Sequence, residues 1–270
     1  MKIAIIITTP DFAGLNIKER LLENYDFIEL NEKFDTHNIY EYKNIKIYTT
    51  DKRCVHCEDF DKEIDADLFL FPTTHRSEAG VKSLSIHTQG NWGKAELGGK
   101  DGTLGVAPSF YLKEFFIELN KQGKDLSYEI TVECTHHGPE IDKPTVFLEI
   151  GTSEVQWKDE KAALAIARTI INVLNKKMKS YKSCILVGGG HYNQTANEIM
   201  LNTEYAVGHI CPKYVLENID EKMLKQAIEK TIPKPEIVIL DWKGLGQYKE
   251  KVKELLEKVG IKYERYQKLN

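Results

Sequence analysis

Short apolar and alternating runs recur along the chain, each bounded by turn residues. Several are continuous enough for strands that are buried on both faces. Residues 39–50 ("IYEYKNIKIYTT") alternate around a Lys-Asn pair, as a β-hairpin does. The other predicted strands are residues 2–8, 67–72, 83–87, 128–134, 144–151, 183–190 and 235–241, with a shorter one at 203–208.

Helical patterns lie between these strands. The clearest is residues 159–179, where apolar residues recur every three or four positions and lysines fill the last turn. The same pattern is found at residues 109–123, 220–230 and 247–260. Alternating strands and helices predict an α/β layered fold with a mixed, mostly parallel sheet. We expect a single domain over residues 1–270, because no repeat or linker divides the chain.

One long glycine-rich segment interrupts this pattern at residues 90–105 ("GNWGKAELGGKDGTLG"). Long loops inside compact domains are usually functional or disordered. The segment is not a phosphate-binding P-loop, since Asp101 stands where Ser or Thr is needed.

Composition narrows the class of protein. Hydrophobic residues make up 41% and charged residues 29%, as in ordinary globular proteins, and no run approaches the roughly 20 apolar residues that span a bilayer. The N-terminus is a poor signal peptide, so we expect a cytoplasmic protein with no membrane partner. The net charge of −4 argues against a general nucleic-acid binder, and no DNA partner is expected. Five scattered cysteines do not form a disulfide framework; Cys54 and Cys57 fit half a zinc site, a redox pair or neither.

Histidines gather at the ends of the predicted strands. Because the carboxyl ends of parallel strands meet at one edge of a sheet, we expect these imidazoles to converge in a crevice beyond that edge. An antiparallel strand would break the convergence for its own histidine. The histidines concerned are His75, His87, His136, His137, His191 and His209, whereas His37 and His56 are interpreted as surface residues.

The segment "HRSE" suggests a metal site. If His75 and Glu78 lie on one helical turn, their i, i+3 spacing puts both side chains on one face, where they could bind a divalent metal. A third imidazole, from His136 or from the "GGGH" turn, would complete a three-ligand zinc site with an open position for water. The alternative is a surface histidine beside a solvated glutamate.

Two versions of catalysis remain open. With a metal, Glu149 or Glu133 would be the general base for a metal-bound water. Without one, an imidazole would position the water, and backbone amides of the "GGGH" turn would hold an oxyanion. No "GxSxG" motif occurs, so water is the predicted nucleophile. We expect His137, Glu149 and His191 to be the catalytic side chains.

Six segments occur in order within residues 8–214: "TTPDFAGLNI", "PTTHRSEAGVKSLSIHTQGNWG", "ECTHHGP", "LEIGTSEVQW", "VGGGHY" and "VGHICPKY". Together they resemble the D-aminoacyl-tRNA deacylase family of archaea and plants, and a further segment, "VILDWKGL", fits as well. One departure is Phe12 in "PDFAG", where the resemblance leads us to expect Pro.

The resemblance implies an activity, a partner, a cofactor and a fold. The family hydrolyses the ester that joins a D-amino acid to the terminal ribose of tRNA, which keeps D-residues out of translation. The partner would then be the acceptor end of D-aminoacyl-tRNA, and the cofactor Zn²⁺. The fold would resemble a phosphorylase/hydrolase-like, three-layer α/β/α sandwich.

Joining this resemblance with the spacing arguments gives a set of site residues. Trp92, in the glycine-rich loop, could stack on the base of the terminal adenosine. We expect substrate contacts from His87, Trp92, Gly189, Gly190 and His209, and metal contacts from His75, Glu78 and His136.

Three alternatives stay open. A zinc peptidase or amidohydrolase on the same fold would cleave peptides and ignore tRNA. A non-catalytic tRNA- or nucleotide-binding protein would bind but not turn over. A phosphorylase would use phosphate as a substrate, because a glycine-rich turn can bind phosphate.

Overall fold

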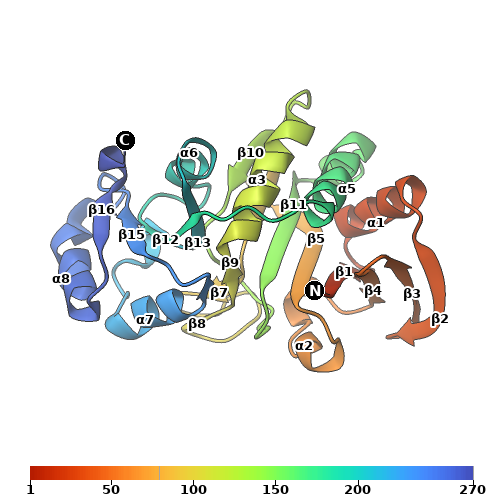
Figure 1. Cartoon of the computed structure of the whole chain (residues 1–270), viewed down its shortest axis with the longest axis horizontal. Helices are drawn as coiled ribbons and strands as arrows, with labels where there is room; N and C mark the ends of the chain where they lie inside the picture. Colours follow the sequence, from red (N-terminus) through yellow and green to blue (C-terminus); the bar gives the residue numbers. More distant parts are fainter. Residues whose placement is uncertain (79, 270) are drawn as a thin grey trace.

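The main sheet runs across the centre of the molecule (Figure 1). The computed structural model describes residues 1–78 and 80–269, and all statements of fold refer to these. The strand order is β10-β6-β11-β5-β1-β4-β3-β2. The strands are β1 (Ile3–Thr8), β2 (Ile28–Phe34), β3 (His37–Tyr42), β4 (Ile45–Thr50), β5 (Leu68–Arg76), β6 (Ser83–His87), β10 (Glu129–Val132) and β11 (Thr145–Thr152).

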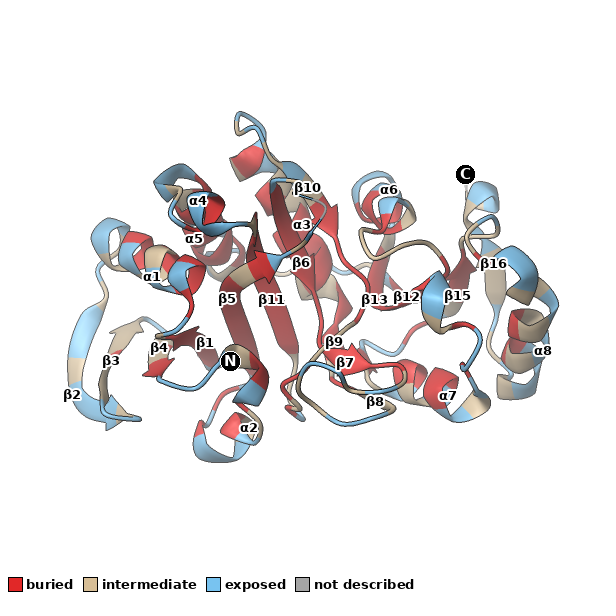
Figure 2. Cartoon of the chain, turned by 180° about the vertical axis from the view of Figure 1, so that it is seen from behind, coloured by how far each residue is buried: buried red, intermediate tan, exposed pale blue. Residues whose placement is uncertain are grey.

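Strand directions in this sheet are mixed. β11, β5, β1 and β4 are parallel to one another, while β6 pairs antiparallel with β11 and parallel with β10. The predicted hairpin is confirmed as β3 and β4, with Lys43 in the left-handed region at the turn. β2 continues it as an exposed edge strand (Figure 2).

A second sheet lies beside the first, in the order β13-β12-β15-β16, and all its pairs are parallel. Its strands are β12 (Lys182–Val187), β13 (Tyr205–Cys211), β15 (Ile237–Leu240) and β16 (Tyr263–Arg265). A short ladder pairs β9 (Ala107–Pro108) with β14 (Thr231–Ile232). The described residues therefore form two large sheets where the sequence predicted one. The predicted strands themselves are confirmed, as is the α/β class with mixed, mostly parallel pairing.

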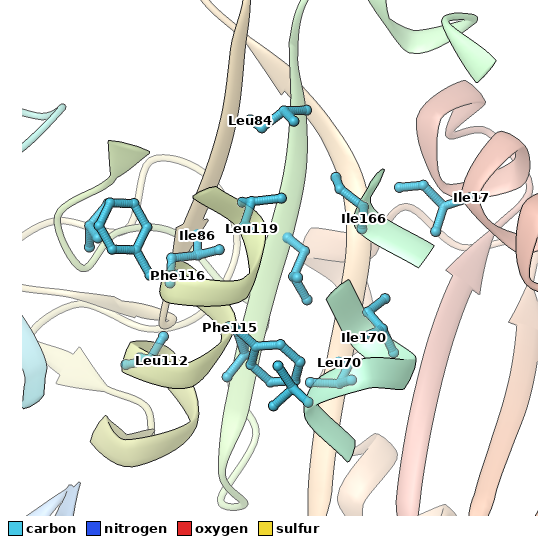
Figure 3. Close-up of a cluster of buried hydrophobic side chains, with 14 of the residues drawn as sticks. Ile17, Leu70, Leu84, Ile86, Leu112, Phe115, Phe116, Leu119, Ile166 and Ile170 are labelled. Carbon is cyan, nitrogen blue, oxygen red and sulfur yellow. The ribbon is translucent and has the colours of Figure 1, made fainter. Parts of the chain in front are cut away.

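Helices cover one face of the main sheet. Residues Leu112, Phe115 and Leu119 of α3 pack with Ile166 and Ile170 of α5 over the apolar face of the strands (Figure 3). Each such large apolar side chain contributes about 1.5–3 kcal/mol by leaving water. The helices of this face are α1 (Phe12–Asn24), α3 (Ser109–Gly123) and α5 (Glu160–Asn175), with the short α4 (Glu154–Trp157) beside them.

The opposite face of the main sheet is covered by short elements. Phe60 and Ile64 pack there against Phe69, Phe71 and Phe147 of the strands. The covering elements are η1 (Cys54–His56) and α2 (Phe60–Glu63). Because this cover is incomplete, polar side chains on this face can reach a cleft.

Three helices surround the second sheet: α6 (Gln194–Asn202), α7 (Glu221–Glu229) and α8 (Lys249–Val259). α3 packs against both sheets, and one apolar cluster includes residues of both, such as Ile86 and Leu186. This continuity fits the predicted single domain, which stays a prediction. Among the described helices, none has the length and apolar character to cross a bilayer.

The glycine-rich segment is more ordered than a structureless loop. Its ends pair as β7 (Gly90–Asn91) and β8 (Thr103–Leu104) in an antiparallel ladder. Its middle lies against the segment after β10, where the Gly138 amide donates to the Leu97 carbonyl at 2.9 Å.

Candidate active site

Strand alternation brings three functional side chains to the face of the main sheet opposite α3 and α5. On β11, Leu148 and Ile150 pack in the core beneath the helices, so Glu149 between them points to the other face. The Glu149 carboxylate reaches His75 of β5 (Oε2 to Nδ1, 3.0 Å) and His87 of β6 (Oε1 to Nε2, 3.3 Å). The Glu149 carboxylate thus lies between the imidazoles of His75 and His87 on this face.

The site centres on Glu149 in the middle of β11, while His75 and His87 lie at the carboxyl ends of β5 and β6, as the sequence predicted. β6 runs antiparallel to β11, so the carboxyl ends of these two strands lie at opposite edges. The imidazoles meet because the register pairs Glu149 with Ser85 on one side and with Thr73 on the other, in the middle of all three strands. The predicted convergence therefore happens on the sheet face.

A glycine makes room for His75. Gly151 pairs with His75 on one side and with Ser83 on the other. A Cβ at Gly151 would lie 2.4 Å from Ser83 Oγ and 3.1 Å from His75 Cδ2, so any side chain there would displace the imidazole. This explains the glycine in "LEIGT".

The segment "ECTHHGP" lies between the two sheets. Its backbone donates from Cys134 to the His191 carbonyl (2.9 Å) and from Thr135 to the Ile210 carbonyl (3.1 Å), both near the second sheet. Its His137 carbonyl accepts from Gly90 (2.8 Å), and His137 has a φ of 42°, rare for a residue with a side chain. These bonds hold Glu133, His136 and His137 over the Glu149 face.

Three histidines, termed the inner imidazoles (His87, His136 and His137), share one hydrogen-bond pattern. Each Nδ1 lies within hydrogen-bond distance of a backbone carbonyl: Thr88 (3.1 Å), Cys134 (2.9 Å) and Gly138 (2.5 Å) respectively. A carbonyl only accepts, so each Nδ1 carries the proton and each Nε2 presents a lone pair. Ligand atoms of the three side chains lie within 4.8 Å of one another. Burial, with the neighbouring imidazoles, holds the pKa of His136 well below its ordinary value.

Glu149 is buried yet charged. Burial alone would raise its pKa, but the close imidazoles of His137, His75 and His87 hold the pKa of this carboxylate well below its usual range. His137 Nε2 is 3.8 Å from Glu149 Oε1. The carboxylate thus borders the space between the inner imidazoles.

A second carboxylate, Glu133, holds the remaining two histidines, termed the outer pair (His75 and His191). Glu133 Oε2 is 2.8 Å from His191 Nε2, and Oε1 is 3.2 Å from His75 Nδ1. His75 directs its Nδ1 proton to Glu149, so Glu133 Oε1 has no hydrogen-bond partner among the described residues. Tyr192 Oη lies 2.8 Å from His75 Nε2.

The outer pair differs from the inner imidazoles in its proton affinity. Burial would lower the pKa of His191, but hydrogen bonds with Cys134 and Glu133 and the Glu133 charge raise that pKa to about 10. For His75, burial is likewise outweighed by the hydrogen bond to Glu149 and the two carboxylate charges, and the net effect raises its pKa. Both are proton carriers, whereas His136 is held neutral.

A cleft of about 570 Å³ opens onto this cluster. This volume is in the usual range for small-molecule sites, about 300–1,000 Å³. Its floor includes His75, His136, His137, Glu149 and His191. Its outer wall comes from the carboxyl ends of β1 and β5, the start of α1, η1 and the β7–β8 segment, with the side chains Asp11, Phe12, Arg53, Cys54, Arg76, Leu97 and Trp157.

The predicted His75–Glu78 metal pair assumed that both residues lie on one helical turn, and this assumption is wrong. His75 lies within β5, where the backbone is extended, and Glu78 follows in an exposed turn. The two residues therefore do not lie on one helical turn, which removes the reason for pairing them as ligands. The strand continues four residues beyond the predicted end at residue 72, and His75 meets Glu133 and Glu149 instead.

Trp92 and His209 do not reach the cleft either, contrary to the predicted substrate contacts. Trp92 is 5% exposed, and its indole N–H donates to the Ile210 carbonyl at 3.0 Å. His209 is fully buried, with Nδ1 3.1 Å from Thr135 Oγ1 and Nε2 3.0 Å from the Gly105 carbonyl. Both residues pack the glycine-rich segment onto the second sheet.

Gly189 and Gly190 form the turn that carries His191 to the site. Gly189 has a φ of 83°, which favours glycine, and neither residue lines the cleft. Their predicted substrate contact stays a prediction.

Two further residues of the site were not predicted from the sequence: Cys134, whose Sγ is 3.5 Å from His191 Nδ1, and Tyr192. Their signal was adjacency, since each follows a site residue directly.

A buried cluster of imidazoles and carboxylates at the floor of a cleft, within an α/β fold, is typical of an enzyme active site. Comparison with known proteins identifies the family. The family model "D-aminoacyl-tRNA deacylase" matches residues 62–264. The chain belongs to this family, and the predicted resemblance is confirmed.

The similarity extends over nearly the whole chain. The D-aminoacyl-tRNA deacylase of Pyrococcus furiosus is 35% identical over 268 residues, covering 96% of this chain and 98% of the relative. That of Thermococcus onnurineus is 36% identical with the same coverage. A crystal structure of a conserved protein of unknown function superposes with a TM-score of 0.92 at 31% identity, covering 99% of this chain and 96% of that one.

Proposed function

We propose that this protein hydrolyses the ester bond of D-aminoacyl-tRNA, releasing the free D-amino acid and tRNA. The observation that carries this proposal is the membership of the family over almost the full length, with relatives named D-aminoacyl-tRNA deacylase. The cleft supports it, because its floor places carboxylates and imidazoles where an ester carbonyl could enter. An aminoacyl ester is an easily hydrolysed bond, so one polarising group and one positioned water suffice.

The inner imidazoles fit a metal ion, and we assign them as its ligands. His87 Nε2 is buried without a hydrogen-bond partner among the described residues, although its Nδ1 is satisfied. A buried lone pair is costly unless a cation or donor meets it. Three lone pairs, each oriented by a carbonyl on the other ring nitrogen, form the donor set and second shell that zinc prefers. When bound there, zinc would polarise the ester carbonyl and acidify a water.

The carboxylates and the outer pair would move the protons. Glu149 is ionised and borders the inner imidazoles, so it is placed to take a proton from the attacking water. His191, which is partly exposed on the cleft wall and bonded to Glu133, is placed to give a proton to the leaving ribose oxygen. Tyr192 and Glu133 would orient His75 and His191 without contacting the substrate.

The test compares D-tyrosyl-tRNA with L-tyrosyl-tRNA as substrates, with and without a chelator. We expect release of D-tyrosine alone, lost on chelation and restored by zinc. Equal release of both enantiomers, or of neither, would contradict the deacylase proposal. Release that is insensitive to chelator would contradict the metal assignment and leave the deacylase intact. Peptide cleavage without tRNA hydrolysis would favour the peptidase alternative.

A further inference from the structure

The mouth of the cleft carries an exposed aromatic ring. Phe12 is the first residue of α1 and is 50% exposed, although large aromatic side chains are mostly buried. It is held in place by its neighbour Asp11, which caps α1 by accepting from the Gly14 amide at 2.8 Å. Asp11 also accepts from the Thr74 amide (2.9 Å), which ties the start of α1 to the end of β5. The backbone at Phe12 is therefore fixed, and its ring lines the cleft with Lys158 Nζ 5.5 Å from the ring centroid.

Two guanidinium groups line the same cleft. Arg53 and Arg76 are exposed, and neither has a carboxylate within ion-pair distance among residues 1–78 and 80–269. Arg76 lies over the Trp157 ring at 4.9 Å from its centroid, which fixes its direction. Cations without carboxylate partners beside an exposed ring match the parts of a nucleotide: phosphates and a base.

The chemistry of the substrate places the base near the ester. In an aminoacyl-tRNA the amino acid is esterified to the ribose that also carries the terminal adenine. An ester carbonyl at Glu149 and the inner imidazoles therefore brings the adenine into the same cleft. Trp92, the aromatic residue that the sequence suggested for stacking, is buried and bonded to Ile210, so it is not available.

We infer that Phe12 is the stacking platform for the terminal adenine of tRNA and that Arg53 binds a backbone phosphate beside it. This inference rests on the proposed deacylase function and names the subsite that holds the nucleotide. Leu97, 46% exposed in the β7–β8 segment, lines the same cleft and adds apolar surface for the base.

The test is a binding cycle with uncharged tRNA that either keeps or lacks its terminal adenosine. For the wild type, removal of the adenosine should weaken binding on the order of tenfold, the effect of one lost base–aromatic stack. For Phe12→Ala the same removal should change the dissociation constant less than about twofold, and Phe12→Trp should restore the wild-type penalty. Ile28→Ala, at a residue that is 68% exposed on edge strand β2, is the matched control and should behave as wild type.

The role of Arg53 is tested through the salt dependence of tRNA binding. Arg53→Ala should weaken binding of both tRNAs alike and reduce the slope of log K against log salt by about 0.7, the value of one single-strand phosphate contact. An unchanged slope would overturn the phosphate assignment.

The outcomes separate this inference from the proposed function. If wild-type protein deacylates D-tyrosyl-tRNA but Phe12→Ala keeps the full penalty for the missing adenosine, the stacking assignment is wrong. The same holds if Phe12→Ala keeps the penalty and instead alters the preference between D-tyrosyl- and D-alanyl-tRNA, since Phe12 would then contact the amino acid. If wild-type protein neither binds nor deacylates tRNA, the proposed function itself fails.

Discussion

Buried histidines of this protein occur in two different surroundings, the floor of the cleft and the packing layer under the glycine-rich segment. In the packing layer both ring nitrogens of His209 are satisfied, by Thr135 and Gly105. Beneath the cleft floor, His87 has only Nδ1 satisfied, by the carbonyl of Thr88, and its Nε2, 3.3 Å from Glu149 Oε1, has no hydrogen bond among the described residues. Both histidines are fully buried, so burial does not distinguish them.

The two histidines differ in whether their second ring nitrogen has a hydrogen-bond partner. A histidine that packs a core finds a donor and an acceptor for its two nitrogens, because a buried polar atom without a partner costs about 1–3 kcal/mol. A histidine that binds a metal uses one nitrogen to fix its orientation and keeps the other free. The inner imidazoles follow the second pattern and His209 the first.

The strongest test of this comparison is His137→Ala. Removing one inner imidazole should abolish stoichiometric zinc binding and lower kcat for D-tyrosyl-tRNA at least about 1,000-fold, because the ligand set and the polarised carbonyl are lost together. Metal analysis and single-turnover kinetics provide the measurements.

His37→Ala is the matched control for that variant. His37 lies on β3 outside the cleft, with Nε2 3.0 Å from Asp51, and its removal should leave zinc content and kcat as in wild type. Comparable losses in both variants would show that the inner imidazoles have no special role.

A smaller effect is expected from His191→Asn. The outer pair is held by carboxylates, so this variant should keep its zinc while kcat falls about 100-fold, as expected for a lost general acid. The informative measurement is the pair of values, zinc content and kcat, on one preparation. Loss of zinc in parallel with kcat would move His191 into the ligand set and erase the difference between inner and outer histidines.

The fold was largely predictable because its strands are apolar runs with local boundaries. The runs around Ile5, Leu70 and Leu148 are buried strands, and the pattern of α3 ended where predicted. The division into two sheets was not predictable, because pairing of distant strands leaves no local pattern. α1 was missed: its buried face includes Arg20, paired with Glu19, Glu23 and Glu160, which weakens the apolar periodicity.

The site was predictable in its members more than in its geometry. His75, His136, His137, Glu149 and His191 do come together, but the carboxyl ends of β6 and β11 lie at opposite edges, so strand register decides which side chains meet. Glu78 was misplaced because nothing in "HRSE" shows that β5 continues through Arg76. For Trp92 and His209 the deciding partners are backbone carbonyls distant in sequence, Ile210 and Gly105, which no local pattern displays.

The smallest effect on turnover is expected from His209→Gln. The informative quantity for this variant is the free energy of unfolding. Burial lowers the pKa of His209 to about 3; the hydrogen bond from its Nε2 to the Gly105 carbonyl opposes this shift, and the charge of Lys230 adds to it. The unfolded chain has a histidine pKa of about 6.5, so it takes up a proton that the folded protein does not as pH falls below that value. The stabilisation by neutral His209 is thus fully present above about pH 6.5 and is lost as pH falls toward 3, at about 1.4 kcal/mol per unit.

Urea titrations at pH 7 and pH 5 would therefore compare wild type with His209→Gln. The variant should be less stable at pH 7 but lack this slope, so the gap in unfolding free energy should shrink by roughly 2 kcal/mol at pH 5. Its kcat at pH 7 should fall less than about tenfold, because His209 acts on the site only through Thr135, the residue before His136. Zinc loss, or a drop in kcat equal to that of His137→Ala, would instead place His209 among the metal-binding histidines. Hydrogen bonding of the second ring nitrogen would then not distinguish metal-binding histidines from packing ones.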